Sequence, residues 1–312
     1  MTNEHVSFHS IGQFRNVIKD APKGVIEFTG TAKLHGTNAS VVFTDKGGFY
    51  AQSRSRVITP EDDNYGFAKF AYDNQGHLER FKWVLNGYGE IIIFGEWCGK
   101  GIQSGVGISQ LDRMFVVFAV KGNGKWINPK IWQKRLKDHF GDLKLAGKQI
   151  FSIYDFPYYI LDINFEYPET AINRLAVLTQ RVEEECPVAK QFGVSGTGEG
   201  IVWSNHEYGL IFKVKGEKHS VFKAKTLTAV DVEKIESIKE FVEYAVTENR
   251  LKQALAEVTP DRDIKKMGDF LRWVYNDIIK EESDTLAGNG LDSKEIGKYV
   301  SAKARTWFLP QL

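Results

Sequence analysis

KLHGTN, at residues 33–38, is the stretch that decides how this chain folds and acts, because it sets a lysine beside a glycine between two β-rich runs. The runs at residues 24–30 and 40–43 are enriched in β-branched and aromatic residues, which predicts two strands. Gly36 lets the backbone turn sharply and a ligand approach closely. Lys33 is therefore a candidate covalent nucleophile, although a lysine at a sheet end is also commonly a solvated side chain.

Three later segments carry side chains suited to work with Lys33. Glu96 ends an apolar run, Glu199 opens another strand, and Lys213 and Lys215 alternate so that both project from one strand face. Two such lysines can hold a phosphate while its charge changes, and a carboxylate suits Mg²⁺ or its water shell. Alternating lysines are also typical of a solvated strand face, but their position after the Glu199 strand favours a site.

In order and spacing, these segments resemble the covalent nucleotidyltransferase superfamily of polynucleotide ligases and capping enzymes. The histidine that stands where Lys-x-Asp-Gly is commoner is similar to the RNA ligase 2 family. Besides KLHGTN and the lysine pair, the likeness rests on Ser53–Ser55, Phe94–Glu96 continuing to Gly101–Gln103, Phe115–Phe118 and Glu199–Val202. The resemblance covers nearly the whole chain. It implies an α+β fold in which an antiparallel-sheet nucleotidyltransferase (adenylyltransferase) domain precedes a small all-α C-terminal domain, with no OB domain.

The chemistry implied by the resemblance is that of an ATP-dependent RNA ligase using Mg²⁺ or Mn²⁺. Lys33 attacks the α-phosphorus of ATP and leaves lysyl-AMP; AMP then passes to an RNA 5′-phosphate, which is sealed to a 3′-hydroxyl. A free lysine has a pKa of about 10.4, so positive charge from Lys213, Lys215 and a divalent cation would favour the nucleophilic amine. The resemblance favours nicks in duplex RNA, with the helical domain helping to hold the duplex. The residues alone give neither strand preference nor DNA tolerance.

Individual roles also follow from the resemblance. Glu199 is the metal candidate, Glu96 accepts from the ribose hydroxyls, and Phe118 stacks on adenine. Arg54 and Asn38 match positions that orient the nucleotide phosphate and the incoming 5′-phosphate. The predicted catalytic residues are Lys33, Arg54, Glu199, Lys213 and Lys215; the predicted nucleotide-binding residues are Lys33, Leu34, His35, Asn38, Arg54, Glu96, Phe118, Glu199, Lys213 and Lys215; the predicted metal ligand is Glu199.

Some of these assignments have plain structural alternatives. Without the family pattern Phe118 would be taken as a core residue. Phe115 and Phe118 are expected on opposite strand faces, so at most one of the two rings faces the nucleotide. Arg56 competes with Arg54 for the phosphate if the strand persists. His35 could donate to a phosphate or position the leaving group, and its role stays open.

Local rather than overall charge points to a polyanion. The 312-residue chain has a formal net charge of +1, which gives no general nucleic-acid signal. Residues 213–225, however, hold five lysines and one glutamate, with His219, Ser220 and Phe222 interleaved. This basic run could follow a nucleic-acid backbone into the site, or it could be a basic linker before a second domain.

The hydrophobic period changes from two to 3.6 at about residue 228, which predicts domains at 1–227 and 228–312. Helices are predicted at residues 10–20, 129–140 and 169–185, and hairpin turns at residues 44–48 and 121–125. In the second domain, Thr259-Pro260 predicts a helix start, and Asp292 with Glu295 predicts a capping box. Two apolar helical stripes are predicted to be core: Ile235, Ile238, Val242 and Ala245, then Ile264, Met267, Leu271, Val274 and Ile278.

The sequence also carries expectations about compartment and partners. Cys98 and Cys186 form neither a disulfide framework nor a metal-knuckle spacing, which fits a reducing compartment and two buried thiols. The N-terminus lacks a signal-peptide pattern, and no apolar run approaches membrane-spanning length. We therefore expect a soluble cytoplasmic protein, with RNA as its partner and no membrane or protein partner implied. A phage or viral repair system would suit the compact two-domain form.

Other functions fit the sequence less well than RNA ligation. A DNA ligase or a capping enzyme would need a β-rich OB domain, and this C-terminus reads as helical. A nonenzymatic RNA-binding module with a vestigial site would not need to retain Lys33, Glu96, Glu199 and both strand lysines. The glycines at residues 99–101 and 196–200 miss the P-loop and dinucleotide spacings, and no zinc or serine hydrolase motif occurs.

Overall fold

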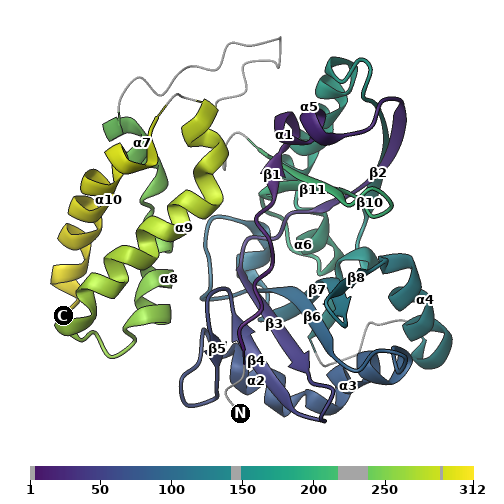
Figure 1. The fold of residues 1–312 in the computed structure, drawn as a ribbon, viewed down its shortest axis with the longest axis horizontal. Coiled ribbons are helices and arrows are strands. Elements are labelled where there is room, and N and C mark those ends of the chain that lie inside the picture. The colour runs from purple at the N-terminus through teal and green to yellow at the C-terminus, as the bar shows by residue number, and fades with distance from the viewer. Residues whose placement is uncertain (1–3, 142–148, 217–237, 289–290) are drawn as a thin grey trace. The chain divides into compact units, whose positions relative to one another are not determined.

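The computed structural model describes residues 4–141, 149–216, 238–288 and 291–312. The chain divides into two compact units, drawn in Figure 1. The first unit comprises Met1–His9 and Phe14–His219, and the second comprises Ser10–Gln13, with the short strand β1 (Gly12–Gln13), and Ser220–Leu312. The boundary predicted at residues 227 and 228 lies outside the described residues, as does the part of the basic run beyond residue 216.

One sheet of the first unit, called sheet A here, carries Lys33 at the end of a strand. Its strands pair antiparallel in the order β12 (Leu210–Lys215), β11 (Gly200–Asn205), β2 (Val25–Ala32) and β10 (Tyr158–Asn164). Alternation along the strands sends Phe28, Trp203 and Phe212 into a core that they share with the helices α1 (Phe14–Asp20) and α5 (Glu169–Glu184). The other face, which carries Thr31, Val202 and Lys213, is called the polar face of sheet A.

A second sheet, called sheet B, carries Glu96. Its order is β5 (Val57–Ile58), β4 (Phe49–Ser53), β3 (Thr37–Phe43), β6 (Ile91–Cys98), β7 (Met114–Gly122) and β8 (Lys125–Ile127), with β9 (Ile150–Ser152) parallel to β7. One face packs on the helices α2 (Phe67–Asp73), α3 (Gln75–Val84) and α4 (Pro129–Phe140) through residues such as Val41, Ile93 and Phe115. Burying side chains of this size contributes roughly 1.5–3 kcal/mol each.

The segments around the site are joined by short helices. α6 (Pro187–Gln191), η1 (Gly107–Gln110) and η2 (Ile153–Asp155) supply part of a further apolar cluster with the end of β2 and with β7. α4 begins at the predicted residue because the Asn128 side chain accepts from the Lys130 N–H and Pro129 occupies the first turn. The predicted helix at residues 10–20 is shorter, since residues 12–13 are strand and α1 begins at Phe14.

The described part of the second unit beyond residue 237 is helical and contains no strand, as predicted for an all-α C-terminal domain. Its helices are α7 (Ile238–Ala245), α8 (Glu248–Val258), η4 (Ile264–Lys266), α9 (Met267–Gly288), α10 (Ser293–Phe308) and η5 (Leu309–Gln311). Val242, Ala245, Val274 and Ile278 are buried in its core, which confirms most of both stripes. Ile264 is 47% exposed and lies in η4 instead, and Ile235 is outside the described residues.

The helix start predicted at Thr259-Pro260 is wrong. Thr259 is the C-cap of α8, and its N–H donates to the Leu255 carbonyl at 3.0 Å. Pro260 disfavours the helical conformation of the residue before it, so it ends a helix here rather than opening one. Of the capping box predicted at Asp292 and Glu295, the N-cap is confirmed, because the Asp292 side chain accepts from the Lys294 N–H at 2.8 Å.

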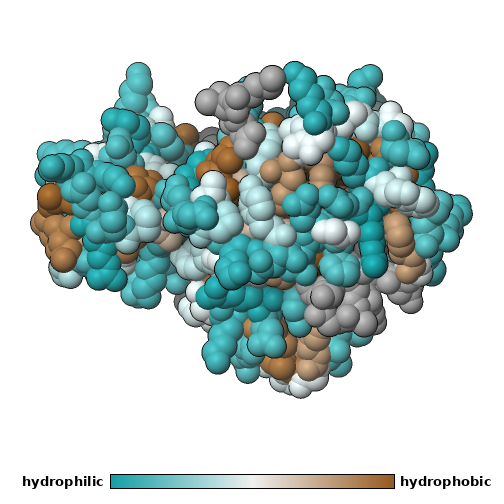
Figure 2. Space-filling view, turned by 90° about the horizontal axis from the view of Figure 1, so that it is seen from below, coloured by the Kyte–Doolittle hydropathy of each residue, from teal (hydrophilic) through white to brown (hydrophobic). Residues whose placement is uncertain are grey.

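The surface is mainly hydrophilic on the face shown in Figure 2, where hydrophobic residues form small separate patches. Among the described residues, no helix combines the length and the apolarity needed to cross a bilayer. Cys98 and Cys186 are both free and buried, as predicted.

Candidate functional site

Lys33 lies directly after β2 and is held against the start of β11. Its N–H donates to the Gly200 carbonyl at 2.8 Å, and its Nζ donates to Glu199 Oε2 at 2.7 Å. Gly200 has φ +148°, and a Cβ there would lie 2.2 Å from the Val214 carbonyl oxygen, so a glycine is required. The two strand ends therefore bring together a lysine and a carboxylate that are 166 residues apart in sequence.

Glu199 is the most enclosed charged group of the site, with only 4% of the residue exposed. Its Oε1 lies 3.4 Å from Lys215 Nζ, and its Oε2 lies 3.3 Å from His35 Nδ1. Burial opposes ionisation, but the charges of Lys33 and Lys215, with His35, hold the pKa of Glu199 well below its ordinary value. At neutral pH the centre of the site is therefore a buried anion surrounded by basic side chains.

The strand register places the two β12 lysines beside this centre. Lys215 is opposite Gly200, and Lys213 is opposite Val202, which in turn is opposite Thr31. Residues opposite each other in an antiparallel pair share a face, so both lysines project from the polar face of sheet A. Lys213 is buried, with 8% exposed, and Lys215 is partly exposed. The structure thus brings Lys33, Glu199 and Lys215 into direct contact, with Lys213 next to them.

Glu96 reaches the same place from sheet B. Its Oε1 accepts the Gly36 N–H at 2.9 Å, and a Cβ on Gly36 would lie 2.3 Å from the Trp97 carbonyl oxygen. Burial raises the pKa of Glu96 to about 7, against the lowering effects of Lys33 and, more weakly, Arg54. The structure therefore places Glu96 within electrostatic range of Lys33 and Arg54. Asn38 lies directly opposite Glu96 in the register of β3 and β6, on the same face.

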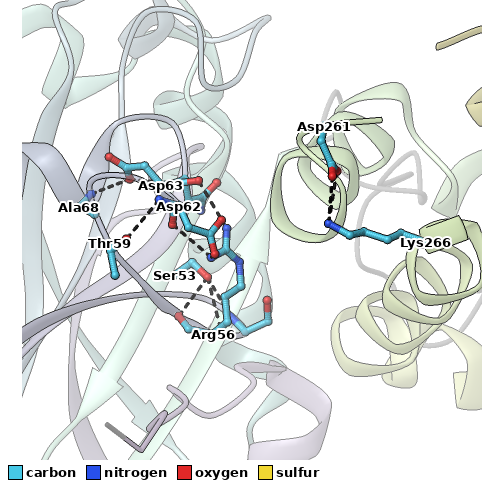
Figure 3. Close-up of polar contacts among 10 residues, drawn as sticks. Ser53, Arg56, Thr59, Asp62, Asp63, Ala68, Asp261 and Lys266 are labelled. Carbon is cyan, nitrogen blue, oxygen red and sulfur yellow. Dashed lines mark hydrogen bonds and ion pairs between the residues drawn. The ribbon is translucent and has the colours of Figure 1, made fainter. Parts of the chain in front are cut away.

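Arg54 and Arg56 differ in their surroundings, which indicate different tasks. Both follow β4, but Arg56 Nη1 donates to Asp62 Oδ2 at 2.8 Å and Nη2 donates to the Asp63 carbonyl, as Figure 3 shows for the loop. Asp63 in turn accepts from the Ala68 N–H at 2.7 Å and so fixes the start of α2. Arg56 is thus engaged in ordering this loop, whereas Arg54 acts on the Glu96 carboxylate.

Phe118 occupies a β-bulge. Phe94 pairs with Ala119 and Gly95 with Val117, so Phe118 has no partner on β6. Its ring is partly buried and packs on the side of sheet B away from α2 and α3, whereas Phe115 is fully buried against those helices. The two rings therefore lie on opposite faces, as predicted, and Phe118 is the one on the Glu96 side.

Leu34 and the N-terminal segment add to the surroundings of the site. The Leu34 side chain is 7% exposed and packs in an apolar cluster, so its contribution to a ligand would be limited to main-chain atoms or apolar contact. Residues 4–9 were missed by sequence reasoning. The Val6 N–H donates to Gln52 at 2.7 Å, and the Phe8 and Phe118 ring centroids are 5.0 Å apart. The alternation of Val6 and Phe8 was the available signal for a strand-like segment.

The donor set restricts the kind of metal that would fit. Within the described residues, no group of three His, Cys, Asp or Glu side chains could hold a metal ion. Glu199 is a single ionised carboxylate that is largely buried. This suits Mg²⁺ or Mn²⁺, which keep several waters and take phosphate oxygens as further ligands, and it does not suit a structural zinc site.

Two mainly antiparallel sheets bring a lysine, two glutamates and a lysine-bearing strand together, and a helical unit follows them. This arrangement defines a nucleotidyltransferase-type fold of the RNA ligase kind. A family model described as RNA ligase matches residues 26–225, and the chain therefore belongs to the RNA ligase family.

Solved structures of a Naegleria gruberi RNA ligase are similar to part of this chain. A mutant Naegleria gruberi RNA ligase with AMP and manganese is 17% identical with a TM-score of 0.50, and another with ATP and manganese is 18% identical with a TM-score of 0.49. Each match covers 69% of this chain and 57% of the Naegleria chain, so little more than half of the Naegleria protein is matched. Comparison with curated proteins gives no match.

Proposed function

We propose that this protein is an ATP-dependent RNA ligase that forms a lysyl-AMP intermediate, transfers AMP to an RNA 5′-phosphate and seals that end to a 3′-hydroxyl. The observation that carries the proposal is the contact of Lys33 with Glu199, flanked by Lys215 and His35. Membership of the RNA ligase family supports the substrate class, and the Naegleria structures with ATP or AMP and manganese support the cofactors.

Each residue has a task that its position supports. In the Glu199 pair Lys33 is an ammonium ion, so it must first lose a proton to solvent before Nζ bonds to the α-phosphorus and the bond to pyrophosphate breaks. Lys213 and Lys215 then bind the phosphate oxygens as their charge grows. Glu96 accepts from the ribose hydroxyls, with Asn38 beside it, and Arg54 orients a phosphate. Phe118 stacks on the base.

Glu199 would hold the divalent cation, Mg²⁺ or Mn²⁺, together with water and phosphate oxygens. When bound, the cation would neutralise charge at the α-phosphate, and Glu199 would then pair less strongly with Lys33. His35, whose Nδ1 already touches Glu199, positions that carboxylate in this proposal. Leu34 contributes main-chain atoms only.

The natural substrate in this proposal is a nick in duplex RNA. The resemblance to the RNA ligase 2 family favours this substrate, and in the proposal the helical unit helps to hold the duplex. The buried free cysteines are consistent with work in the reducing cytoplasm. DNA ligase activity is the rival, and the absence of strands in the described part of residues 238–312 counts against it.

The test is adduct formation followed by sealing. Incubation with α-labelled ATP and Mg²⁺ should give an acid-labile protein adduct in the wild type and none in Lys33→Ala. Lys69→Ala is the matched control, because it removes an exposed lysine that pairs with Asp73 on α2. Sealing is then compared on nicked duplex RNA, single-stranded RNA and nicked DNA. The lysyl-AMP mechanism would be overturned if the wild type formed no adduct, or if wild type and Lys33→Ala sealed equally. The assignment of RNA as the substrate would be overturned if nicked DNA were sealed faster than RNA.

A further inference from the structure

A second basic segment, at residues 121–141, lies outside the motifs that carry the family resemblance. It contains six lysine or arginine residues and one acidic residue, so its net charge is +5 in a chain whose formal net charge is +1. The whole segment belongs to the described residues, and it forms the end of β7, the edge strand β8 and helix α4. Positive charge gathered in this way attracts a polyanion even when the whole protein is almost neutral.

Helix α4 turns its lysines away from the protein. Lys130, Lys134 and Lys137 are spaced four and three residues apart, so they lie on one side of the helix and span roughly 10 Å of its length. The opposite side carries Trp132 and Leu136, which are buried in the core between sheet B and its helices. All three lysines are exposed, and the single acidic residue of the helix pairs with Lys134 at 2.6 Å. The exposed side of α4 therefore keeps an excess of positive charge.

The strand part of the segment lies on the same face of sheet B as Glu96. Lys121 is opposite Ile92 on β6 and opposite Trp126 on β8. Ile92 is four residues before Glu96 on the same strand, so the two side chains share a face and lie roughly 13 Å apart. Lys121 Nζ is 4.5 Å from the centre of the Trp126 ring, which also packs on Phe8. The lysine of the segment nearest to Glu96 is therefore held in place by aromatic packing.

Two kinds of polyanion bind basic segments that contain exposed aromatic side chains: the phosphate backbone of a nucleic acid and the surface of an anionic membrane. A membrane-surface helix inserts its apolar side into the lipid. In α4 that side is used inside the protein, because Trp132 and Leu136 are buried. Charge without a free apolar side favours the phosphate backbone, and membership of the RNA ligase family supports RNA as its source.

We propose that residues 121–141 bind the phosphate backbone of duplex RNA beside the nick, mainly through Lys125, Lys130 and Lys134. The inference rests on the proposed function for the class of nucleic acid, and it adds a surface of the first unit that none of the site residues includes. Contacts to phosphate fix the position of a nucleic acid without reading its sequence. The surface would therefore hold any duplex in register while the chemistry proceeds at Lys33.

The test is RNA binding by the triple variant Lys125→Ala/Lys130→Ala/Lys134→Ala. Affinity for nicked duplex RNA is measured by fluorescence anisotropy over a range of salt concentrations, with Lys33→Ala added to prevent turnover. At about 0.1 M salt the affinity should fall by about tenfold or more, and the slope of log K against log salt should fall by about two to three, as expected for three lost phosphate contacts. Without Lys33→Ala, adduct formation from ATP in the absence of RNA should stay within about twofold of wild type, because the three lysines are exposed and lie outside the nucleotide site.

Lys19→Ala/Lys23→Ala/Lys69→Ala is the matched control, because it removes the same charge from three exposed lysines of the first unit that lie outside the segment. Its affinity for RNA and its salt slope should stay close to those of the wild type. Urea midpoints of both triple variants check that each is folded as the wild type is.

Equal loss of affinity in the two triple variants would overturn the inference, since net charge alone would then explain the loss. An unchanged salt slope would also overturn it, as would tighter binding of the protein to phosphatidylserine vesicles than to the RNA. If the wild type forms no adduct from ATP but the salt slope still falls in the Lys125→Ala/Lys130→Ala/Lys134→Ala variant, the proposed function fails and the RNA-binding surface stands.

Discussion

Lys33 Nζ and Glu199 Oε2 are 2.7 Å apart, so the side chain proposed as the nucleophile is held by the carboxylate proposed to bind the cation. An amine paired with a carboxylate keeps its proton and cannot attack phosphorus. Occupation of Glu199 by a cation would weaken that pair and favour the free amine. The ion pair therefore couples deprotonation of Lys33 to binding of the cation at Glu199.

Glu199→Gln should abolish this linkage while keeping the shape of the side chain. Adduct formation from ATP should fall by at least about 100-fold, because one charged group at a reacting phosphate is commonly worth that much. The measurement is the single-turnover rate of adduct formation over a range of Mg²⁺ and Mn²⁺ concentrations. Asp62→Asn, which removes the exposed partner of Arg56, is the control and should leave the rate unchanged. A Glu199→Gln rate within fivefold of wild type would contradict the role.

Glu96 makes stability depend on pH. Burial raises its pKa from 4.5 to about 7, so the folded state binds this proton more tightly than the unfolded state. Protonation of Glu96 therefore adds to the free energy of unfolding. This contribution is fully present below about pH 4.5 and is lost as the pH rises through 7, by up to about 3 kcal/mol. Glu96→Gln should therefore be more stable than wild type at pH 8 and similar at pH 5.

The measurement is the urea midpoint of both proteins at these two pH values. The same substitution should weaken adduct formation, because a glutamine accepts poorly from two ribose hydroxyls. If the urea midpoints of wild type and Glu96→Gln changed equally with pH, the Glu96 carboxyl would not be the source of the pH-dependent stability.

Gly36→Ala should destabilise the first unit. The new Cβ would lie 2.3 Å from the Trp97 carbonyl oxygen and 2.7 Å from Cys98 Cβ, in a region of buried backbone that cannot easily move. A loss of about 1–3 kcal/mol in the free energy of unfolding is expected, from urea denaturation. Gly87→Ala is the matched control, since a Cβ there meets nothing within 4 Å. Similar losses in both variants would contradict the steric explanation.

Arg54→Ala and Arg56→Ala should have different effects. Arg54→Ala should slow adduct formation or AMP transfer by 10-fold or more, an order typical of a lost charged contact to phosphate, with little change in stability. Arg56→Ala removes the contacts to Asp62 and Asp63 and should mainly increase proteolysis within residues 59–66. Rates of adduct formation and AMP transfer, and limited proteolysis, are measured for both variants. A slower reaction in Arg56→Ala alone would assign the phosphate contact to Arg56 instead of Arg54.

The sequence predicted elements best where local signals agree. α4 begins at Pro129 as expected because an asparagine cap and a first-turn proline coincide, and the hairpin at residues 121–125 follows from Asn123 and Gly124, both with positive φ. Thr259-Pro260 misled because threonine and proline also end helices, and only the packing of α8 distinguishes the two cases. The helices α2 and α3 were not predicted, because α2 is capped by Asp63, five residues before Ala68, and α3 has no side-chain cap.

The sequence named candidate site residues but not the contacts between them. Lys33, Glu199 and Lys215 were named from motif spacing, and the structure adds that they touch. The choice between Arg54 and Arg56 depended on Asp62, which no motif contains. The packing of residues 4–9 on Phe118 depends on long-range contacts that a local pattern does not encode.

The bulge at Phe118 means that β7 contains one residue more than β6 over the stretch that they share. Deleting Ala119 would remove that surplus and let Phe118 pair with Phe94, while Val117 stays opposite Gly95 and Val120 stays opposite Ile93. The extra residue of β7 therefore helps to set the position of the Phe118 ring on the Glu96 side of sheet B. Chain length at this point, as much as residue type, is under constraint.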